Sequence, residues 1–246
     1  MAENRDRWCE RRSLGAILPG VKAAPPIIAI IPAYQEGPRL GPVVEGARRH
    51  LPVVVVDDGS TDDTAAVAEA AGATVLRQTP NAGKGAALRA GFRHALALGA
   101  DAVVTLDADG QHDPAEIPAF LAAWGAERPE LVIGQRDLSA MPPVRRISNV
   151  VGGWALAAAL GRSVPDNQSG YRLIGRQLMR SLLDSDESGF EFEVEMIARC
   201  IALGLPMTAV PIRTIYGGEP SHIRPWRHFT EFVRVTRKAR RVARGG

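Results

Sequence analysis

The chain has 246 residues, of which 46% are hydrophobic and 23% charged, a composition typical of a globular protein that can bury one large core. Its two cysteines form no CxxC pair or ligand cluster, which excludes a disulfide framework or a zinc site and indicates a reducing cytoplasm. The net charge of +3 comes from residues 222–246, where eight Arg or Lys residues face one Glu, so the rest of the chain is acidic.

The first residues of the chain, 1–24, predict an N-terminal arm that ends at Pro25-Pro26. They are charged and lack the apolar core of a signal peptide. The longest apolar run of the chain, residues 150–160, has about half of the roughly 20 residues that a membrane span needs. We therefore expect no transmembrane helix.

Short apolar runs rich in β-branched residues begin after this arm. They do not alternate with polar residues, which indicates strands buried on both faces of a parallel sheet. The runs are residues 27–31, 53–56, 73–76, 102–106 and 131–133.

Helical stretches of about a dozen residues separate these runs. They are residues 40–50, 62–71, 83–98 and 114–124. The second follows Ser60-Thr61-Asp62-Asp63, whose capping and acidic side chains suit a helix N-terminus. Strand and helix alternating at this spacing predict an α/β fold with a doubly wound, mostly parallel sheet.

The regular alternation fades after residue 135. We expect, in order, a loop at 136–143, a helix near 147–160, a polar turn at 165–170, a helix at 191–203 and a strand at 207–212. No repeat or low-complexity linker interrupts the sequence. One catalytic domain, residues 25–221, is therefore expected between the arm and a basic tail, residues 222–246.

Polar clusters follow three of the predicted strands, at the edge where such sheets bind ligands. In the cluster that follows the predicted strand at 102–106, Asp107 and Asp109 stand one residue apart, so both can approach one hard cation. Gln111 offers a further oxygen. Oxygen-only ligation suits Mg²⁺ or Mn²⁺, and the cation would neutralise a diphosphate leaving group. A solvated acidic turn is the commoner explanation of such a pair alone.

Each of the other polar clusters, taken alone, is weaker evidence for a ligand site. Asp57-Asp58 can bind a uracil or guanine N–H or a ribose hydroxyl, or can cap the next helix, and Tyr34 and Glu36 face the same rim. Asn81-Ala82-Gly83-Lys84-Gly85 lacks the spacing of an ATPase phosphate loop. Lys84 at a helix N-terminus is a reasonable neighbour of an anion, and a plain tight turn is the equal alternative.

Taken together and in order, these segments resemble the family 2 glycosyltransferases of the GT-A fold. The resemblance rests on residues 32–36, 54–62, 81–85, 106–112, 134–136 and 166–172. It extends from about residue 27 to 222 and is strongest to the polyprenol-phosphate sugar synthases, the dolichyl-phosphate mannose synthase branch. In that branch a Gln-His pair follows the acidic motif, as Gln111-His112 does here.

This resemblance implies roles for individual residues. The metal would be held by Asp107, Asp109 and Gln111. The nucleotide-sugar would be bound by Pro32, Ala33, Tyr34, Glu36, Val56, Asp58, Lys84, Asp107, Ala108 and Asp109. Arg136 would lie near the phosphates, and Asp166 would be the base or an acid that orients the acceptor. The acceptor phosphate would be met by Arg145 or Arg146, with Gln168 and Ser169.

The basic tail suits an amphipathic helix. Phe229, Phe232 and Val233 fall on one side of it and Arg234 and Arg241 on the other, a pattern typical of helices on anionic bilayers. A helix packed on the domain is the main alternative. A nucleic-acid arm is disfavoured, because no aromatic side chains interleave with the tail arginines.

The expected activity is inverting transfer of a hexose from a GDP-mannose or UDP-glucose type donor to a polyprenyl monophosphate. The enzyme would be peripheral on the cytoplasmic membrane face. Three alternatives stay open: the same donor with a saccharide or small-metabolite acceptor, a catalytically silent sugar-nucleotide-binding subunit, and a nucleotidyltransferase. The sequence specifies neither the sugar, the base, the metal nor the oligomeric state.

Overall fold

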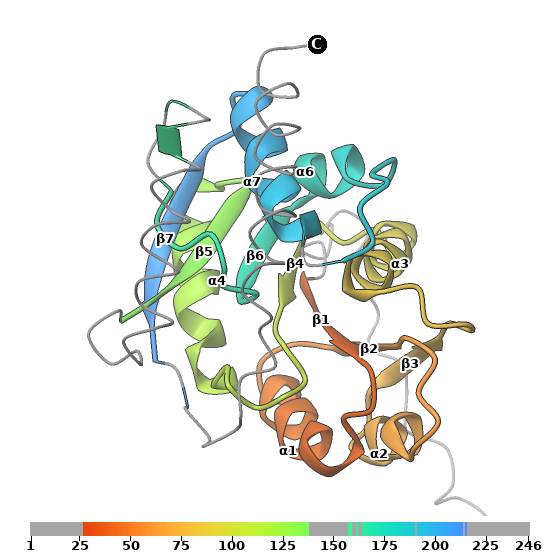
Figure 1. Cartoon of the computed structure of the whole chain (residues 1–246). Helices are drawn as coiled ribbons and strands as arrows, with labels where there is room; N and C mark the ends of the chain where they lie inside the picture. The colour runs from red at the N-terminus through yellow and green to blue at the C-terminus, as the bar shows by residue number, and fades with distance from the viewer. Residues whose placement is uncertain are drawn as a thin grey trace, which may run out of the picture.

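A mixed β-sheet organises the computed structural model, which describes residues 27–137, 157–158, 161, 164–189, 191–213 and 215. Its strands are β1 (Ile27–Ala33), β2 (Val53–Asp57), β3 (Thr74–Arg77), β4 (Ala102–Thr105), β5 (Leu131–Arg136), β6 (Arg172–Gly175) and β7 (Met207–Ile212). Within this part of the chain their order is β3-β2-β1-β4-β6-β5-β7 (Figure 1). The predicted α/β class is confirmed.

The first half of the sheet is parallel, as its sequence predicts. β1 pairs with β2 on one side and with β4 on the other, and β3 pairs with β2, all in parallel register. Every residue of β2 and β4 is buried, because helices cover both faces. This two-sided burial explains the unbroken apolar runs.

The second half contains a reversed strand that the sequence analysis did not predict. β6 runs antiparallel to both β4 and β5, whereas β5 and β7 are parallel. The strand has four residues, begins with the charged Arg172 and ends at Gly175, so it offers no apolar run to detect.

The helices are α1 (Gly37–Arg48), α2 (Thr64–Ala70), α3 (Lys84–Ala97), the short 3₁₀ helix η1 (Pro114–Glu116), α4 (Ile117–Glu127), α6 (Arg176–Ser181) and α7 (Glu191–Ala202). The predicted helices correspond to α1 to α4 and α7 to within a few residues, whereas α6 was not predicted. The helix expected near residues 147–160 lies largely outside the described residues. None of the described helices is long and apolar enough to cross a bilayer.

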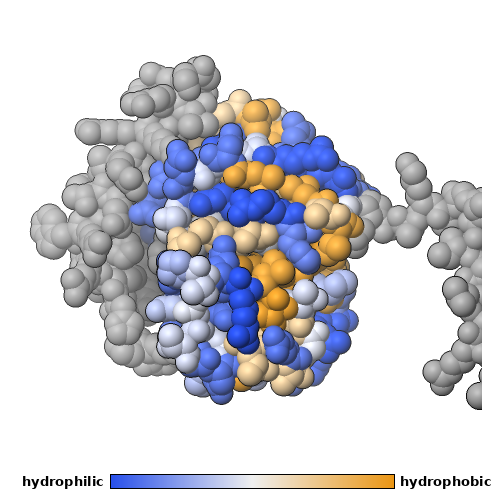
Figure 2. Space-filling view, turned by 90° about the vertical axis from the view of Figure 1, so that its right-hand side faces the viewer, coloured by the Kyte–Doolittle hydropathy of each residue, from blue (hydrophilic) through white to orange (hydrophobic). Residues whose placement is uncertain are grey.

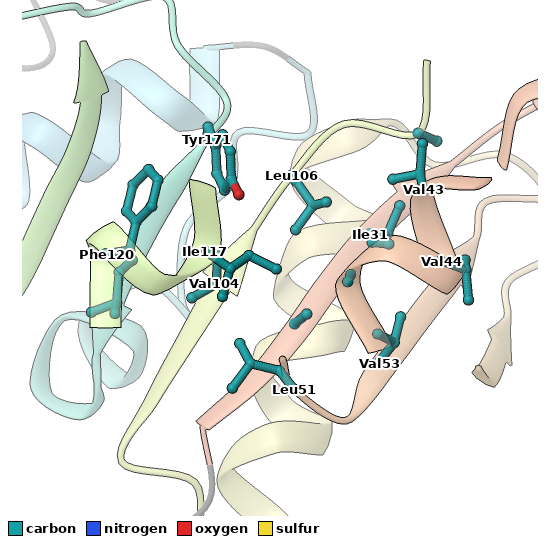
Figure 3. Close-up of a cluster of buried hydrophobic side chains, with 14 of the residues drawn as sticks. Ile31, Val43, Val44, Leu51, Val53, Val104, Leu106, Ile117, Phe120 and Tyr171 are labelled. Atoms are coloured by element: carbon teal, nitrogen blue, oxygen red, sulfur yellow. The ribbon is translucent and has the colours of Figure 1, made fainter. Parts of the chain in front are cut away.

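Two hydrophobic clusters fill the space on either side of the sheet. One joins α1, α2 and α4 to alternate strand residues such as Ile31 and Val53, and Figure 3 shows part of it around Phe120 and Tyr171. The other joins α3, α6 and α7 to the intervening strand residues, including Ile30. Helices on both faces make the sheet doubly wound, as predicted.

β3 is the edge of the parallel half. Its pattern leaves Thr74 and Arg77 exposed and the two apolar residues between them half-buried. Figure 2 shows the face on which α3 and β3 lie in Figure 1, with hydrophobic bands interrupted by hydrophilic residues. Arg77 lies 3.9 Å from Glu69, and charged side chains at a sheet edge disfavour pairing with another chain.

Candidate active site

The loops that follow β1, β2 and β4 meet at one edge of the sheet, because parallel strands end on the same side. Glu36 in the first loop is close enough to Asp109 in the third for the two carboxylates to repel each other. Asp58 in the second loop is linked through the turn at 82–84 to Asp107. The acidic clusters predicted from the sequence therefore share one rim.

The loop after β1 is fixed by the loop after β2. Gln35 has a positive φ of 58°, its backbone N–H donates to Ser60 Oγ at 3.0 Å, and its amide Nε2 donates to Thr61 Oγ1 at 2.8 Å. The backbone N–H of Glu36 donates to Thr64 Oγ1 at 2.9 Å. These bonds hold Tyr34, whose side chain is 50% exposed, at the rim.

Glu36 also pairs with a residue of α1, the helix that it precedes. Its carboxylate pairs with Arg39 Nη2 at 2.8 Å. Burial raises the pKa of Glu36 above its usual value, Arg39 lowers it, and the Asp109 carboxylate raises it further. The side chain is therefore part of a charged rim, in which Asp109 is a close neighbour.

Three predicted nucleotide-binding residues are small or apolar and buried. Val56 is 0% exposed and belongs to the hydrophobic cluster under α3. Ala33 and Ala108 are also buried, whereas Pro32 is half-buried. Any contact of Val56 with a nucleotide would have to go through its backbone.

Asp58 holds the glycine-rich turn. Its two carboxylate oxygens accept from the backbone N–H groups of Ala82 at 2.9 Å and of Gly83 at 2.7 Å. Gly83 has a φ of +95° and lies so close to the carbonyl of Ser188 that a Cβ would collide with it. Asp58 thus anchors the turn that presents Lys84, a role that the sequence did not suggest. Its role in nucleotide binding remains a prediction.

Lys84 lies between two carboxylates. Its Nζ is 2.5 Å from Asp107 Oδ1 and 2.9 Å from Glu193 Oε1 on α7. Burial alone would lower the pKa of Lys84, but Asp107 and Glu193 together outweigh it and raise it. Burial would raise the pKa of Asp107, but Lys84, followed by His112, lowers it to about 2. Both groups are therefore charged at neutral pH.

The rest of the acidic motif is held by its own backbone and side chains. Asp109 accepts from the backbone N–H of Gln111 at 2.9 Å and from the Gln111 amide Nε2 at 2.8 Å. The backbone N–H of Asp107 donates to Nδ1 of His112 at 3.1 Å, which assigns the ring proton of neutral His112 to Nε2. Burial lowers the pKa of His112. His112 thus positions Asp107.

The donor set fits a hard divalent cation in its chemistry. In the described part of the chain no group of three His, Cys, Asp or Glu side chains converges, so the predicted set would be Asp107, Asp109 and the Gln111 amide oxygen. The Lys84 ammonium is paired with Asp107, so this carboxylate already faces positive charge. Phosphate and water oxygens would complete the coordination of Mg²⁺ or Mn²⁺.

Arg136 and Asp166, the two predicted catalytic residues, are in direct contact. Arg136 Nε donates to Asp166 Oδ2 at 2.7 Å and Nη2 donates to Oδ1 at 3.0 Å, a two-point ion pair. The backbone N–H of Gln168 also donates to Asp166 Oδ1, at 3.1 Å. Both carboxylate oxygens of Asp166 are occupied by these bonds, so the contacts favour the orienting role over the base.

The turn after Asp166 is held by the buried Arg172, which the sequence analysis did not single out for this role. Its Nε donates to the carbonyl of Ser169 at 2.8 Å, its Nη1 to that of Glu193 at 2.6 Å and its Nη2 to that of Asn167 at 3.2 Å. Of the predicted acceptor residues, Gln168 is exposed but Ser169 is fully buried.

Several other predicted features cannot be placed. Arg145 and Arg146, the N-terminal arm and the basic tail lie outside the described residues.

Comparison with known proteins agrees with this geometry. The family described as "Glycosyl transferase family 2" matches residues 28–183. An undecaprenyl-phosphate mannosyltransferase of Micrococcus luteus is 35% identical over 201 residues, which cover 76% of this chain and 82% of the relative. A polyprenol monophosphomannose synthase of Mycolicibacterium smegmatis is 32% identical over 75% of this chain and 76% of its own.

A third relative is a UDP-N-acetylglucosamine–dolichyl-phosphate N-acetylglucosaminyltransferase of Methanococcus voltae, 29% identical over 77% of this chain and 86% of its own.

Solved structures show the same architecture. Glucosyl-3-phosphoglycerate synthase from Mycobacterium tuberculosis in complex with Mn²⁺ and UDP-glucose has a TM-score of 0.70 and 25% identity, covering 89% of this chain and 80% of that one. Its complex with Mg²⁺ and UDP has a TM-score of 0.66, 23% identity and coverage of 90% and 79%. The likeness shows the fold of the GT-A glycosyltransferases.

The order of the strands, the shared rim and the match over most of the chain lead to one conclusion. The chain belongs to glycosyltransferase family 2, in the branch that contains the polyprenol-phosphate sugar synthases.

Proposed function

We propose that the chain is a metal-dependent, inverting hexosyltransferase that moves a sugar from a GDP-mannose or UDP-glucose type donor to a polyprenyl monophosphate. The observation that carries the proposal is the meeting of Lys84, Asp107 and the Asp109–Gln111 pair at one rim of the sheet. A departing diphosphate needs fixed positive charge beside it, and these residues supply one cation and oxygen ligands for a second.

Different residues of the rim would bind different parts of the donor. Tyr34 and the loop after β2 would bind the nucleotide, since both stand at the carboxyl ends of neighbouring strands. Mg²⁺ or Mn²⁺ bound at Asp107, Asp109 and Gln111 would neutralise the charge that develops on the leaving diphosphate. Lys84 adds a permanent positive charge next to Asp107.

The acceptor side requires orientation more than proton transfer. A phosphate monoester is already anionic at neutral pH, so its oxygen can attack without a strong base. Asp166 holds the Arg136 guanidinium by two hydrogen bonds, which aims a cation at the rim. In this proposal Arg136, with Arg145 or Arg146, attracts the acceptor phosphate. Asp166 orients Arg136. Gln168 and Ser169 belong to the turn that follows Asp166.

The relatives support the acceptor class more strongly than the sugar. Their names specify undecaprenyl, polyprenol and dolichyl phosphates as acceptors, whereas the sugar differs between mannose and N-acetylglucosamine. The similar solved structures contain Mn²⁺ or Mg²⁺, which supports the use of a divalent metal.

An acceptor assay tests the proposal. The full chain is incubated with Mn²⁺, a short polyprenyl phosphate and radiolabelled GDP-mannose, UDP-glucose or UDP-N-acetylglucosamine, and label is counted in the organic phase. We expect lipid-linked label from one donor and its loss on addition of EDTA. Label on 3-phosphoglycerate or a saccharide, but not on the lipid, would overturn the acceptor. Pyrophosphate release from a nucleoside triphosphate would indicate a nucleotidyltransferase.

Substitution of Asp109 separates an enzyme from a silent binding subunit. Asp109→Ala removes a predicted metal ligand and should lower turnover about 100-fold or more. Asp184→Ala is the matched control, because Asp184 is an exposed carboxylate whose partner is Arg199 on α7. Equal turnover in the two variants would contradict a catalytic role for the acidic motif.

A further inference from the structure

Glu193 belongs to none of the segments that predicted the site, yet its carboxylate lies at the centre of it. The residue stands in the first turn of α7 and is 7% exposed. Its Oε1 accepts from Lys84 Nζ at 2.9 Å, while the same ammonium donates to Asp107 Oδ1 at 2.5 Å. One lysine is therefore shared between a predicted metal ligand and a carboxylate outside the predicted set.

The main chain holds Glu193 in this position. Its carbonyl accepts from Nη1 of the buried Arg172 at 2.6 Å. Gly170 packs against the carboxylates of Asp107 and Glu193. A Cβ at Gly170 would lie 2.8 Å and 2.9 Å from the Asp107 carboxylate oxygens and 3.0 Å from Glu193 Oε1. The Asp107 and Glu193 carboxylates therefore both lie against Gly170, where a larger residue would displace them.

Charge balance gives Glu193 a role. If Asp107 coordinates a divalent cation, the Lys84 ammonium and that cation compete for the same carboxylate and repel each other. Lys84 is largely buried, and Asp58 fixes its backbone through Gly83, so the ammonium starts from a position beside both carboxylates. Glu193 is already within hydrogen-bond distance and can keep the ammonium paired.

We propose that Glu193 is a positioning residue that retains Lys84 when Asp107 exchanges its contact with the lysine for a divalent cation. The inference rests on the proposed metal dependence and deepens it. Lys84 then stays at the rim as a second positive charge, and the buried ammonium is never left without a carboxylate.

Metal binding without turnover tests this role. Free Mn²⁺ is measured by electron paramagnetic resonance during titration of the full chain, with GDP or UDP present. Glu193→Gln keeps the size of the side chain but removes its charge, so the Kd for Mn²⁺ should rise about tenfold, the value of one charge-assisted hydrogen bond. Glu127→Gln, an exposed residue at the end of α4, is the matched control and should leave the Kd unchanged.

The same substitution in a variant that lacks Lys84 distinguishes the proposed exchange at Asp107 from a simple attraction between Glu193 and the cation. In Lys84→Met no ammonium needs a partner, so Glu193→Gln should change the Kd for Mn²⁺ at most about threefold, the remaining direct attraction. An effect of Glu193→Gln that is as large without Lys84 as with it would overturn the proposal. If Glu193→Gln does not fold by circular dichroism, Glu193→Asp, which withdraws the carboxylate, is compared in the same two backgrounds.

The two proposals fail in different ways. Absence of Mn²⁺ binding in the unsubstituted chain would overturn both. Normal Mn²⁺ binding that is insensitive to Glu193, or sensitive to it regardless of Lys84, would overturn only the exchange and leave the metal-dependent transferase intact.

Discussion

Lys84 is the residue at which three parts of the chain meet. Asp58, after β2, fixes the turn before it, and its ammonium joins Asp107, after β4, to Glu193 on α7. A buried charge of this kind is stable only when it is paired and hydrogen-bonded. The rim is therefore held together by its charges as well as by the sheet beneath it.

The lowered pKa of Asp107 predicts an acid-sensitive contribution to stability. The pKa of Asp107 is about 2 in the folded chain against an ordinary value of 3.8, so the contribution is fully present above the unfolded pKa and is lost as pH falls from about 4 towards 2. The difference between these two pKa values corresponds to a contribution to the free energy of unfolding on the order of 2 kcal/mol.

Urea unfolding at pH 5 and at pH 2.5 measures this contribution. The unsubstituted chain should lose more stability between the two values than Asp107→Asn, which has no carboxylate to protonate. Equal losses in the two proteins would contradict a stabilising Lys84–Asp107 pair.

At the residue scale, the sequence revealed the carboxylates but not what holds them. Asp107, Asp109 and Asp58 were found because they directly follow apolar strands. Glu193 was missed because it lies in a helix far along the chain and has no motif spacing. An available signal was the acidic residue on the buried, apolar side of that helix, since a buried charge requires a partner.

At the scale of elements, the contact between α4 and the start of β6 supports the acidic motif from below. Phe120 on α4 stacks on Tyr171 with ring centroids 4.4 Å apart, and Tyr171 in turn lies 5.1 Å from the ring of His112. The Tyr171 hydroxyl donates to the carbonyl of Asp113 at 3.1 Å. This aromatic row connects the hydrophobic core of Figure 3 to Asp107 through His112.

Truncation of Phe120 should therefore destabilise the fold. Phe120→Ala leaves a cavity at a fully buried position and should lower the free energy of unfolding by about 3–5 kcal/mol. The control is Leu98→Ala at the end of α3, where the side chain is 56% exposed and a change within about 0.5 kcal/mol is expected. Thermal unfolding of both variants measures the difference, and similar melting temperatures would contradict the role assigned to the aromatic row.

The elements that the sequence predicted are those with long periodic patterns. β1 is an apolar run, β2 and β4 are apolar apart from their last residues, Asp57 and Thr105, and helix and strand alternate regularly up to β5. β6 was missed because the guanidinium of Arg172 is buried by bonds to three main-chain carbonyls, which no local pattern reveals. Its reversed direction depends on pairing with β4 and β5, strands distant in sequence.

At the scale of the whole molecule, the charge distribution predicts attachment to a membrane surface. The described domain contains the site, while eight basic residues are concentrated in residues 222–246. We propose that this tail brings the enzyme to an anionic, cytoplasmic membrane face, where a polyprenyl phosphate would be embedded. Each basic residue near such a surface contributes about 1 kcal/mol of attraction.

Vesicle sedimentation tests the tail. The full chain should bind vesicles that contain an anionic lipid, and binding should weaken as salt rises, because salt screens the attraction. A chain that ends at residue 221 should remain in the supernatant but still transfer sugar to a short, soluble polyprenyl phosphate. Equal sedimentation of the two chains would favour the alternative, a tail packed on the domain.

The reversed direction of β6 has a consequence for how this architecture can acquire new acceptors. β5 ends and β6 begins at the same rim, so the connection between Arg136 and Arg172 starts and finishes beside the acidic motif. A longer connection is compatible with the pairing of β5 with β6, and the entropy of closing a longer loop grows only slowly with its length. The residues proposed to bind the donor stay with the sheet, so we expect that a change of acceptor would be made in this one segment.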